Sequence, residues 1–147
     1  MRTAFASALL AAAVTCAVAP KAPAQDQYMA QADSQLARIK RTLGPRYSES
    51  RQMIHRGFSD ATPQNQNFTW DRASYVVAAA GDIHVAGIKL RLYNENNVIV
   101  AADTSGSRTP RISVTVPDFG TFYRLEMAIT SCSEYPCYIA LMPYQRQ

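Results

Sequence analysis

The sequence has few of the features on which enzymatic sites are built. It contains only two histidines, His55 and His84, and no Gly-x-Ser-x-Gly turn of the kind that presents the nucleophile of many hydrolases. Its six glycines form no phosphate-binding loop, and its histidines and acidic residues show no metal-site spacing. The eleven acidic residues are dispersed and mark no pair that would face one cleft. We therefore predict a protein that is not an enzyme and has no metal or cofactor.

Long apolar runs are also missing, apart from one at the start of the chain. Arg2 precedes an apolar stretch over residues 4–19, and Ala22-Pro23-Ala24 offers the small-x-small sequence that signal peptidase accepts. This stretch is shorter than the about 20 residues that a membrane-spanning helix needs. We expect residues 1–24 to be a cleaved signal, with an uncleaved anchor or a lipid on Cys16 as alternatives. The mature chain would start at Gln25, have no stable membrane span, and be periplasmic or secreted.

Cysteine is scarce, and its placement is informative. If Cys16 leaves with the signal, Cys132 and Cys137 remain, an even number in an oxidising compartment. Pro136 lies between them and favours a turn that brings the two thiols together. A redox pair usually has two intervening residues rather than four, and a metal pair would need further ligands nearby. We predict a structural disulfide between Cys132 and Cys137.

The region after the signal has the periodicity of an amphipathic helix. Apolar residues recur at spacings of three and four, and Gly44-Pro45 ends the pattern; the stripe comprises Met29, Ala32, Leu36, Ile39 and Leu43. The stripe is too short for a coiled coil, so we expect it to pack on the domain or on a partner. A second short helix is expected over Ser48 to His55. We assign residues 25–57 to a helical arm and residues 58–67 to a linker.

Positive charge is concentrated in this arm. Residues 36–57 hold six basic residues against Glu49 alone: Arg38, Lys40, Arg41, Arg46, Arg51 and Arg56. Loss of Arg2 and Lys21 with the signal would leave 13 of the 15 basic residues against 11 acidic ones. The segment has a single aromatic residue, Tyr47, rather than several interleaved for base stacking, and exported proteins seldom meet nucleic acid, so we predict no nucleic-acid binding. The charges indicate either a solvated helix face or a partner contact.

From Phe68 onward the apolar pattern has a period of two. Ile88, Leu90 and Leu92 alternate with residues of the opposite face, and turn clusters separate about six such runs. The pattern predicts a mainly β domain over residues 68–147, an antiparallel β-sandwich in which each sheet has one face in water. Trp70, the only tryptophan, stands at the first strand, and we expect it to pack in the core or at a sheet edge.

Several segments of this region resemble the bacterial pre-peptidase C-terminal domain, as found in small exported bacterial proteins: Ile88–Tyr93, Val98–Asp103, Pro110, Pro117–Tyr123 and Cys132 to Cys137. The resemblance covers about residues 68–144 and implies a jelly-roll-like sandwich behind the helical arm. Some members of that family bind calcium at an acidic stretch. Here the matching stretch has Gly87 and Lys89 at the two acidic positions, and only Asp82 and Asp103 remain as isolated carboxylates. The resemblance therefore supports the fold and not the calcium site.

These observations favour a non-catalytic exported binding or accessory protein of the bacterial cell envelope that contacts a protein partner. The candidate contact residues are the helix cations and the aromatic residues expected at turns or on outward positions: Arg38, Arg41, Phe119, Phe122 and Tyr135. A carbohydrate-binding module is the alternative, because sandwiches often present aromatic platforms to sugars. We expect His84 to be a surface histidine in a turn and His55 to be solvated in the helical arm. The sequence does not indicate the oligomeric state.

Overall fold

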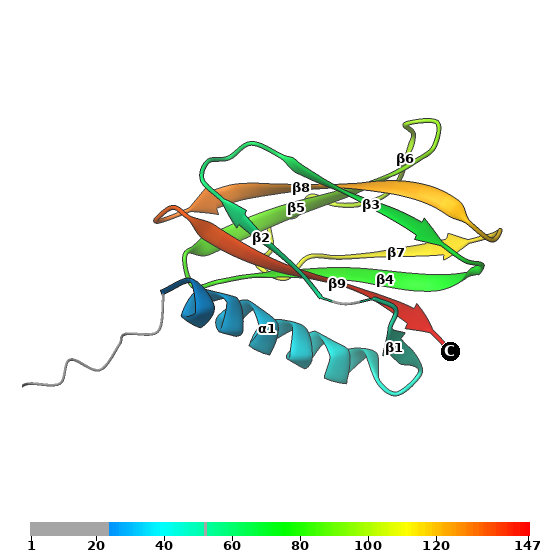
Figure 1. Ribbon diagram of the computed structural model, residues 1–147, viewed down its shortest axis with the longest axis horizontal. Helices are drawn as coiled ribbons and strands as arrows, with labels where there is room; N and C mark the ends of the chain where they lie inside the picture. Colours follow the sequence, from blue (N-terminus) through cyan, green and yellow to red (C-terminus); the bar gives the residue numbers. More distant parts are fainter. Residues whose placement is uncertain (1–23, 52) are drawn as a thin grey trace, which may run out of the picture.

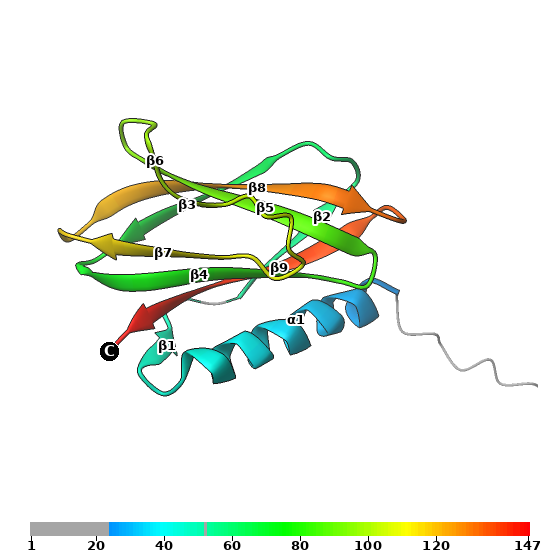
Figure 2. The same ribbon diagram turned by 180° about the vertical axis from the view of Figure 1, so that it is seen from behind.

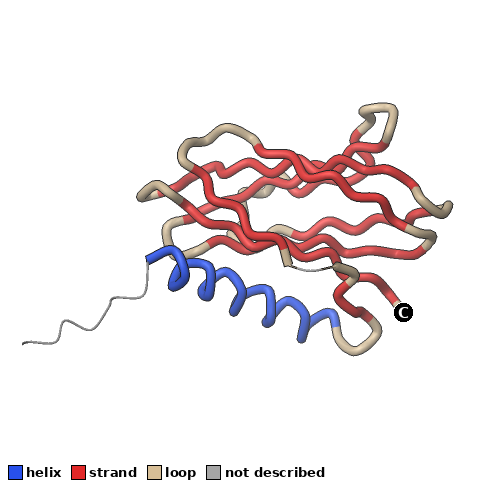
Figure 3. The backbone as a smooth tube through the Cα atoms, in the orientation of Figure 1, coloured by secondary structure: helices blue, strands red, loops and turns tan. Residues whose placement is uncertain are grey.

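The computed structural model describes residues 24–51 and 53–147, so the expected signal, apart from Ala24, lies outside the described residues. Helix α1 (Ala24–Leu43) comes first and the strands follow it (Figures 1 and 3). The strands are β1 (Tyr47–Glu49), β2 (Ile54–Phe58), β3 (Gln64–Trp70), β4 (Ala73–Gly81), β5 (Val85–Asn94), β6 (Ile99–Asp103), β7 (Arg111–Val116), β8 (Thr121–Cys132) and β9 (Cys137–Arg146). No helix in this described part of the chain is both long and apolar enough to cross a membrane.

The strands form two antiparallel sheets that face each other, as Figure 2 shows from behind. One sheet has the order β1-β9-β4-β7, and β2 also pairs with β9; α1 lies on its outer side, and we call it the helix-side sheet. The other has the order β3-β8-β5-β6, and we call it the open sheet. The predicted mainly β, antiparallel architecture is confirmed, and the arrangement is sandwich-like, with one helix in the described part of the chain.

A continuous apolar core fills the space between the sheets. Ile88, Leu90 and Leu92 of β5 are fully buried there, as their alternation predicts. Trp70 is only 3% exposed, and its ring stacks at 4.8 Å from those of both Phe68 and Tyr75. The expectation that Trp70 packs inside the domain is therefore confirmed.

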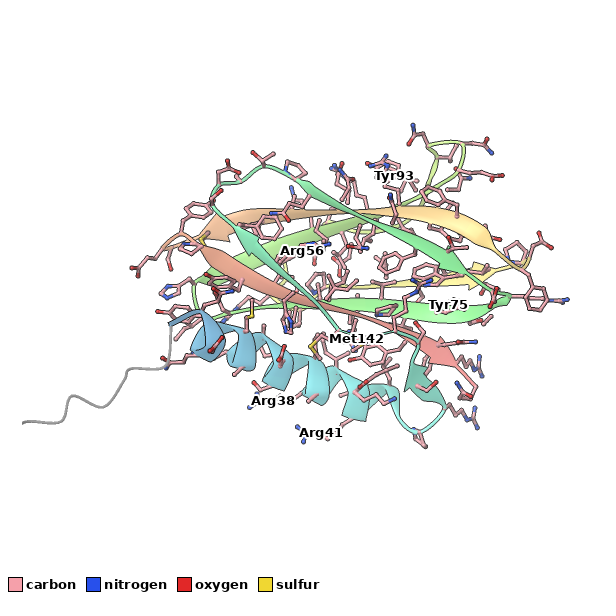
Figure 4. All side chains as sticks on the ribbon, in the orientation of Figure 1. Arg38, Arg41, Arg56, Tyr75, Tyr93 and Met142 are labelled. Carbon is pink, nitrogen blue, oxygen red and sulfur yellow. A yellow bond between two sulfur atoms is a disulfide. The ribbon has the colours of Figure 1, made fainter. Side chains whose placement is uncertain are left out.

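Helix α1 covers the outer face of β4 and β9, and this arrangement creates a second apolar cluster. Leu36 and Ala32 are fully buried against it. The sheet contributes mostly small residues, which allow the helix a close approach: Ala78, Ala80, Ala140, Met142 and Tyr144. Figure 4 shows Met142 between β9 and α1. The expectation that the apolar stripe of the helix packs on the domain is confirmed.

Polar contacts fix the helix along its length. The side chain of Gln35 donates to the carbonyl of Gly81 at 3.0 Å, and Nε2 of His55 lies 2.6 Å from Oδ1 of Asp33. The hydroxyl of Tyr144 donates to the carbonyl of Leu36 at 3.3 Å. Burial beneath the helix, reinforced by the negative charge of Glu49, raises the pKa of Tyr144 to about 12. Tyr144 therefore stays a neutral donor throughout the physiological pH range.

The segment between α1 and β3 differs from its sequence-based prediction. The helix expected over Ser48 to His55 is wrong, because β1 and β2 occupy this region and both pair with β9. Residues 64–67, expected to be part of a linker, belong to β3 and pair with β8. Strands β1 and β2 are short, and their hydrogen-bonding partner, β9, is distant in sequence. The local sequence pattern therefore carries little information about them.

The expected wet face on each sheet is also wrong for the helix-side sheet. In β4, residues 75–81 are all buried, because alternate side chains face the core and the helix. On β5 of the open sheet, by contrast, Lys89, Arg91 and Tyr93 lie on the half-buried outer face. Figure 4 shows Tyr93 pointing away from the core. The pattern of one wet face thus holds only where no helix covers the sheet.

The predicted disulfide joins the end of β8 to the start of β9. The Cα atoms of Cys132 and Cys137 are 6.2 Å apart, and Cys137 is fully buried in the core between the sheets. The bridge closes the loop of residues 133–136, three of which line a cleft.

Replacing both Cys132 and Cys137 with serine should lower the free energy of unfolding by roughly 2 kcal/mol, because the bridge restricts the unfolded chain. We expect the double variant still to fold, since the apolar core remains. Urea unfolding of the double variant and of the unaltered protein measures this difference, and thermal melting of the unaltered protein with and without reductant checks it. Identical melting temperatures in the two conditions would show that the bridge does not stabilise the domain.

Replacing Leu36 with Asp should destabilise the whole domain by at least about 3 kcal/mol, because a charge would replace a fully buried apolar side chain. Ala37→Asp is the matched control, since Ala37 is exposed on the same helical turn. It should cost less than about 1 kcal/mol, mainly through helix propensity. Urea unfolding measures both. Equal stability of the two variants would mean that α1 does not contribute to the folded unit.

Candidate functional site

The five predicted contact residues lie on three separate surfaces. Arg38 and Arg41 extend from α1 away from the sheets (Figure 4). Phe119 lies in the turn just before β8, Phe122 is the second residue of that strand, and Tyr135 lies in the loop after it. Because β8 is 12 residues long, about 40 Å separates its two ends. The expected exposure of the three aromatic side chains is confirmed at 79%, 40% and 43% respectively, but the five residues do not form one site.

Arg38 lies in a furrow along one side of α1. Two adjoining hollows of about 390 and 260 Å³ make up this furrow, and both are lined by Gln35 and Arg38. The remaining lining residues are Gln31, Ser34, Ile39 and Thr42 of the helix, and Ile83, Arg108, Thr109 and Arg111 of the opposite wall. We call this feature the α1 furrow.

The spacing of residues along the helix explains one wall of the furrow. Gln31, Gln35, Arg38 and Thr42 are separated by four, three and four positions, which places them on one face. The side-chain oxygen of Gln31 accepts the N–H of Ile83 at 3.1 Å. With the bond from Gln35 to the Gly81 carbonyl, this contact ties the helix to the connection between β4 and β5. The furrow wall is therefore fixed rather than free to move.

Asp82 organises the opposite wall from inside the protein. Its side chain is fully buried, and its carboxylate accepts the N–H groups of His84, Val85 and Tyr138 at 2.8, 3.2 and 2.8 Å. Its backbone carbonyl accepts a bond of 2.8 Å from the guanidinium of Arg108. Asp82 thus shapes the connection between β4 and β5 and positions one arginine of the furrow.

Asp103 plays a similar part in the connection between β6 and β7. Partial burial opposes its ionisation, but bonds from the hydroxyl and N–H of Ser105 and from the N–H of Arg111 outweigh burial and lower the pKa of Asp103. The charge of Arg111 acts in the same direction. Asp103 thus holds the loop from which Arg111 extends.

Gly87 occupies one of the two positions at which the pre-peptidase C-terminal domain often has an acidic residue. A Cβ atom at Gly87 would lie 2.3 Å from the Thr130 hydroxyl oxygen and 2.5 Å from the Gly106 carbonyl oxygen, so an acidic side chain has no room there. Asp82 and Asp103 are both occupied by N–H donors. Within residues 24–51 and 53–147, no group of three or more His, Cys, Asp or Glu side chains could hold a metal ion.

The arginines of the furrow have little compensating negative charge. Among the described residues, the ion pairs are His55 with Asp33, His84 with Glu134, and Arg91 with Glu126. Arg38, Arg41 and Arg108 therefore have no acidic side chain within 4.0 Å in this part of the chain. Ile83, in the same furrow, is 62% exposed. The surface combines unpaired cations with an exposed apolar side chain.

A separate hollow, outside the α1 furrow, lies beside the first turns of α1. It is a cleft of about 210 Å³, lined by Tyr28, His84, Glu134, Tyr135, Pro136 and Tyr138; we call it the tyrosine cleft. His84 lies in a turn, as expected, but its ring is half-buried in the cleft and packs on Tyr28 at 4.9 Å. His55 is half-buried too, and it lies on β2 rather than on a helix.

The tyrosine cleft brings a serine, a histidine and a carboxylate together, but not in the geometry of a hydrolase. The hydroxyl of Ser133 lies 3.3 Å from Nδ1 of His84, and a carboxylate oxygen of Glu134 lies 3.9 Å from the same atom. A catalytic triad needs the nucleophile on one imidazole nitrogen and the carboxylate on the other. The arrangement therefore does not prepare Ser133 for nucleophilic attack.

The sequence alone does not predict this cleft, because 56 positions separate Tyr28 from His84 and 54 separate His84 from Tyr138. Of the lining residues, the sequence predicts only Tyr135 as a contact residue, through its place in the disulfide loop. A comparison of the chain with models of known protein families finds no match, and a search among curated proteins finds none either. The function is therefore argued from the geometry of these surfaces.

Proposed function

We propose that the chain is a non-catalytic exported binding protein of the bacterial cell envelope whose α1 furrow contacts an acidic protein partner. The observation that carries the proposal is that Arg38 and Arg108 of the furrow have no acidic side chain within 4.0 Å among the described residues and share the furrow with the exposed side chain of Ile83. Arg41, which lies three positions after Arg38 on α1 and outside the furrow lining, is a further cation of this kind. Arginine forms two-point hydrogen bonds with carboxylates and is enriched at protein interfaces. An exposed apolar anchor supplies the buried centre that such interfaces need.

The composition of the furrow favours a protein over a sugar or a nucleic acid. Sugars and bases are held by stacking on aromatic faces, and the furrow lining contains no aromatic residue. A carbohydrate-binding module would present an exposed aromatic platform, but Trp70, the only tryptophan of the chain, is buried. An acidic segment of a partner protein would match both the charge and the elongated form of the furrow.

The proposal includes the compartment and the detailed fold. Cleavage after Ala24 would leave the buried stripe of α1 intact, because its first fully buried member is Ala32. The disulfide between Cys132 and Cys137 is compatible with an oxidising compartment, either periplasmic or extracellular.

We take the two facing sheets as a jelly-roll-like sandwich of the pre-peptidase C-terminal kind. The mismatched triad geometry around His84 supports the non-catalytic part of the proposal.

The test uses the tagged mature chain, residues 25–147, to capture crosslinked proteins from an envelope fraction, followed by affinity measurement with the purified partner. The furrow variant carries Arg38→Glu and Arg108→Glu. The matched control carries Arg72→Glu and Arg146→Glu, which change the net charge equally at exposed positions outside the furrow lining. Deleting the helix is not a suitable control, because it would expose the apolar face of β4 and β9.

The furrow variant should weaken the affinity at least about tenfold, and the control should change it less than about twofold. Binding to the unaltered chain should also weaken as salt concentration rises, because exposed charges are screened. Equal affinities of the two variants, or a partner whose contact surface is not acidic, would contradict the proposal.

A further inference from the structure

We propose that the tyrosine cleft is a second binding site, separate from the α1 furrow, and that it takes a methylated ammonium group such as trimethylammonium. The cleft is lined by three tyrosine side chains, one imidazole, one proline and one carboxylate. Cations with apolar methyl groups bind to the faces of aromatic rings, because the ring quadrupole is negative on the face.

The rings of the cleft do not all lie in one plane. The planes of Tyr28 and Tyr138 lie within 19° of each other, with their centroids 6.3 Å apart, which is too close for a methylated ammonium to lie between them. The ring of His84 stands at 80° to that of Tyr28. A ligand would therefore lie in the hollow beside these rings, which Tyr135 and Pro136 also line. A compact cation there can contact several aromatic side chains at once.

The electrostatic character of the cleft is opposite to that of the furrow. Glu134 is the one carboxylate among the lining residues, and no Lys or Arg belongs to that lining. Its carboxylate lies 3.9 Å from Nδ1 of His84, at the solvent-exposed rim of the cleft. An anion would meet the Glu134 charge and the negative ring faces, whereas a cation would be attracted by both.

The walls are fixed before any ligand arrives. The disulfide between Cys132 and Cys137 closes the loop that carries Glu134, Tyr135 and Pro136. The N–H of Ser133 donates to the carbonyl of His84 at 2.9 Å, and so links this loop to the opposite wall. The buried Asp82 carboxylate holds the backbone of both His84 and Tyr138. Little conformational entropy is therefore lost on binding.

The size of the cleft selects a small group. Its volume of about 210 Å³ is below the about 300 Å³ at which pockets for drug-sized ligands begin. A trimethylammonium group is compact and would be enclosed, whereas an oligosaccharide or peptide would lie mostly outside. The group could belong to a free small molecule or to the headgroup of a phospholipid, and the same contacts would recognise both.

Calorimetric titration of the mature chain with choline tests the proposal directly. The control ligand is 3,3-dimethyl-1-butanol, which has the shape of choline but no charge. We expect choline to bind at least about tenfold more tightly, which corresponds to a partly desolvated cation–π contact. Equal affinity of the two ligands, or no binding of choline at tens of millimolar, would overturn the proposal. Binding of methyl glucoside without binding of choline would also overturn it and indicate a sugar site.

Variants then locate the site. Tyr28→Leu should weaken choline binding about tenfold, and Glu134→Gln should weaken it severalfold. Phe122→Leu is the matched control, because Phe122 is an exposed aromatic residue outside the cleft, and it should have no effect. If Tyr28→Leu fails to fold, the comparison of choline with its uncharged analogue on the unaltered chain still decides the question.

Two further comparisons separate the ligand source and the two sites. Cosedimentation with phosphatidylcholine vesicles, but not with phosphatidylglycerol vesicles, would identify the headgroup as the source; binding of free choline alone would identify a small molecule. A furrow variant with Arg38→Glu alone, which leaves the bond from Arg108 to Asp82 intact, should bind choline normally, so failure of either site can be recognised without reference to the other. Loss of choline binding in that variant would contradict the separation of the sites.

Discussion

The burial of the α1 stripe on the outer face of β4 and β9 is the contact on which the other features depend. Ala32 and Leu36 are fully buried there, against a face made largely of alanine. This contact makes β4 and β9 the middle layer of the molecule and places one helix, about 30 Å long, across the sheet. Without it, the apolar face of the helix-side sheet would be exposed, and both proposed sites would lose a wall.

The two proposed sites share this helix and differ in charge. Tyr28, near its start, lines a cleft whose charged group is a carboxylate, while Arg38, further along, lines a furrow rich in arginine. Asp82 connects them inside the protein, since its side chain holds His84 and Tyr138 and its carbonyl holds Arg108. One buried carboxylate therefore supports a cation-attracting and an anion-attracting surface.

The features predicted correctly from sequence are those with local periodicity or local spacing. The stripe of α1, the alternation of β5 and the disulfide each depend on neighbouring residues, and each is confirmed. The short strands β1 and β2 were missed, because their stability comes from pairing with β9 at the other end of the chain. The sequence also did not predict that α1 covers the outer face of the helix-side sheet. Small residues such as Ala78 and Ala80 do not indicate which element packs on them, because that element is distant in sequence.

Native-state hydrogen exchange tests the central contact most directly. If α1 is an integral layer of the domain, the amides of residues 32–40 should be protected as strongly as those of β4 and β9, because they would be released only on global unfolding. Exchange of these helix amides at rates close to those of an unfolded peptide, while β4 and β9 remain protected, would show a loosely attached arm. That result would contradict both the layered fold and the two sites that α1 helps to form.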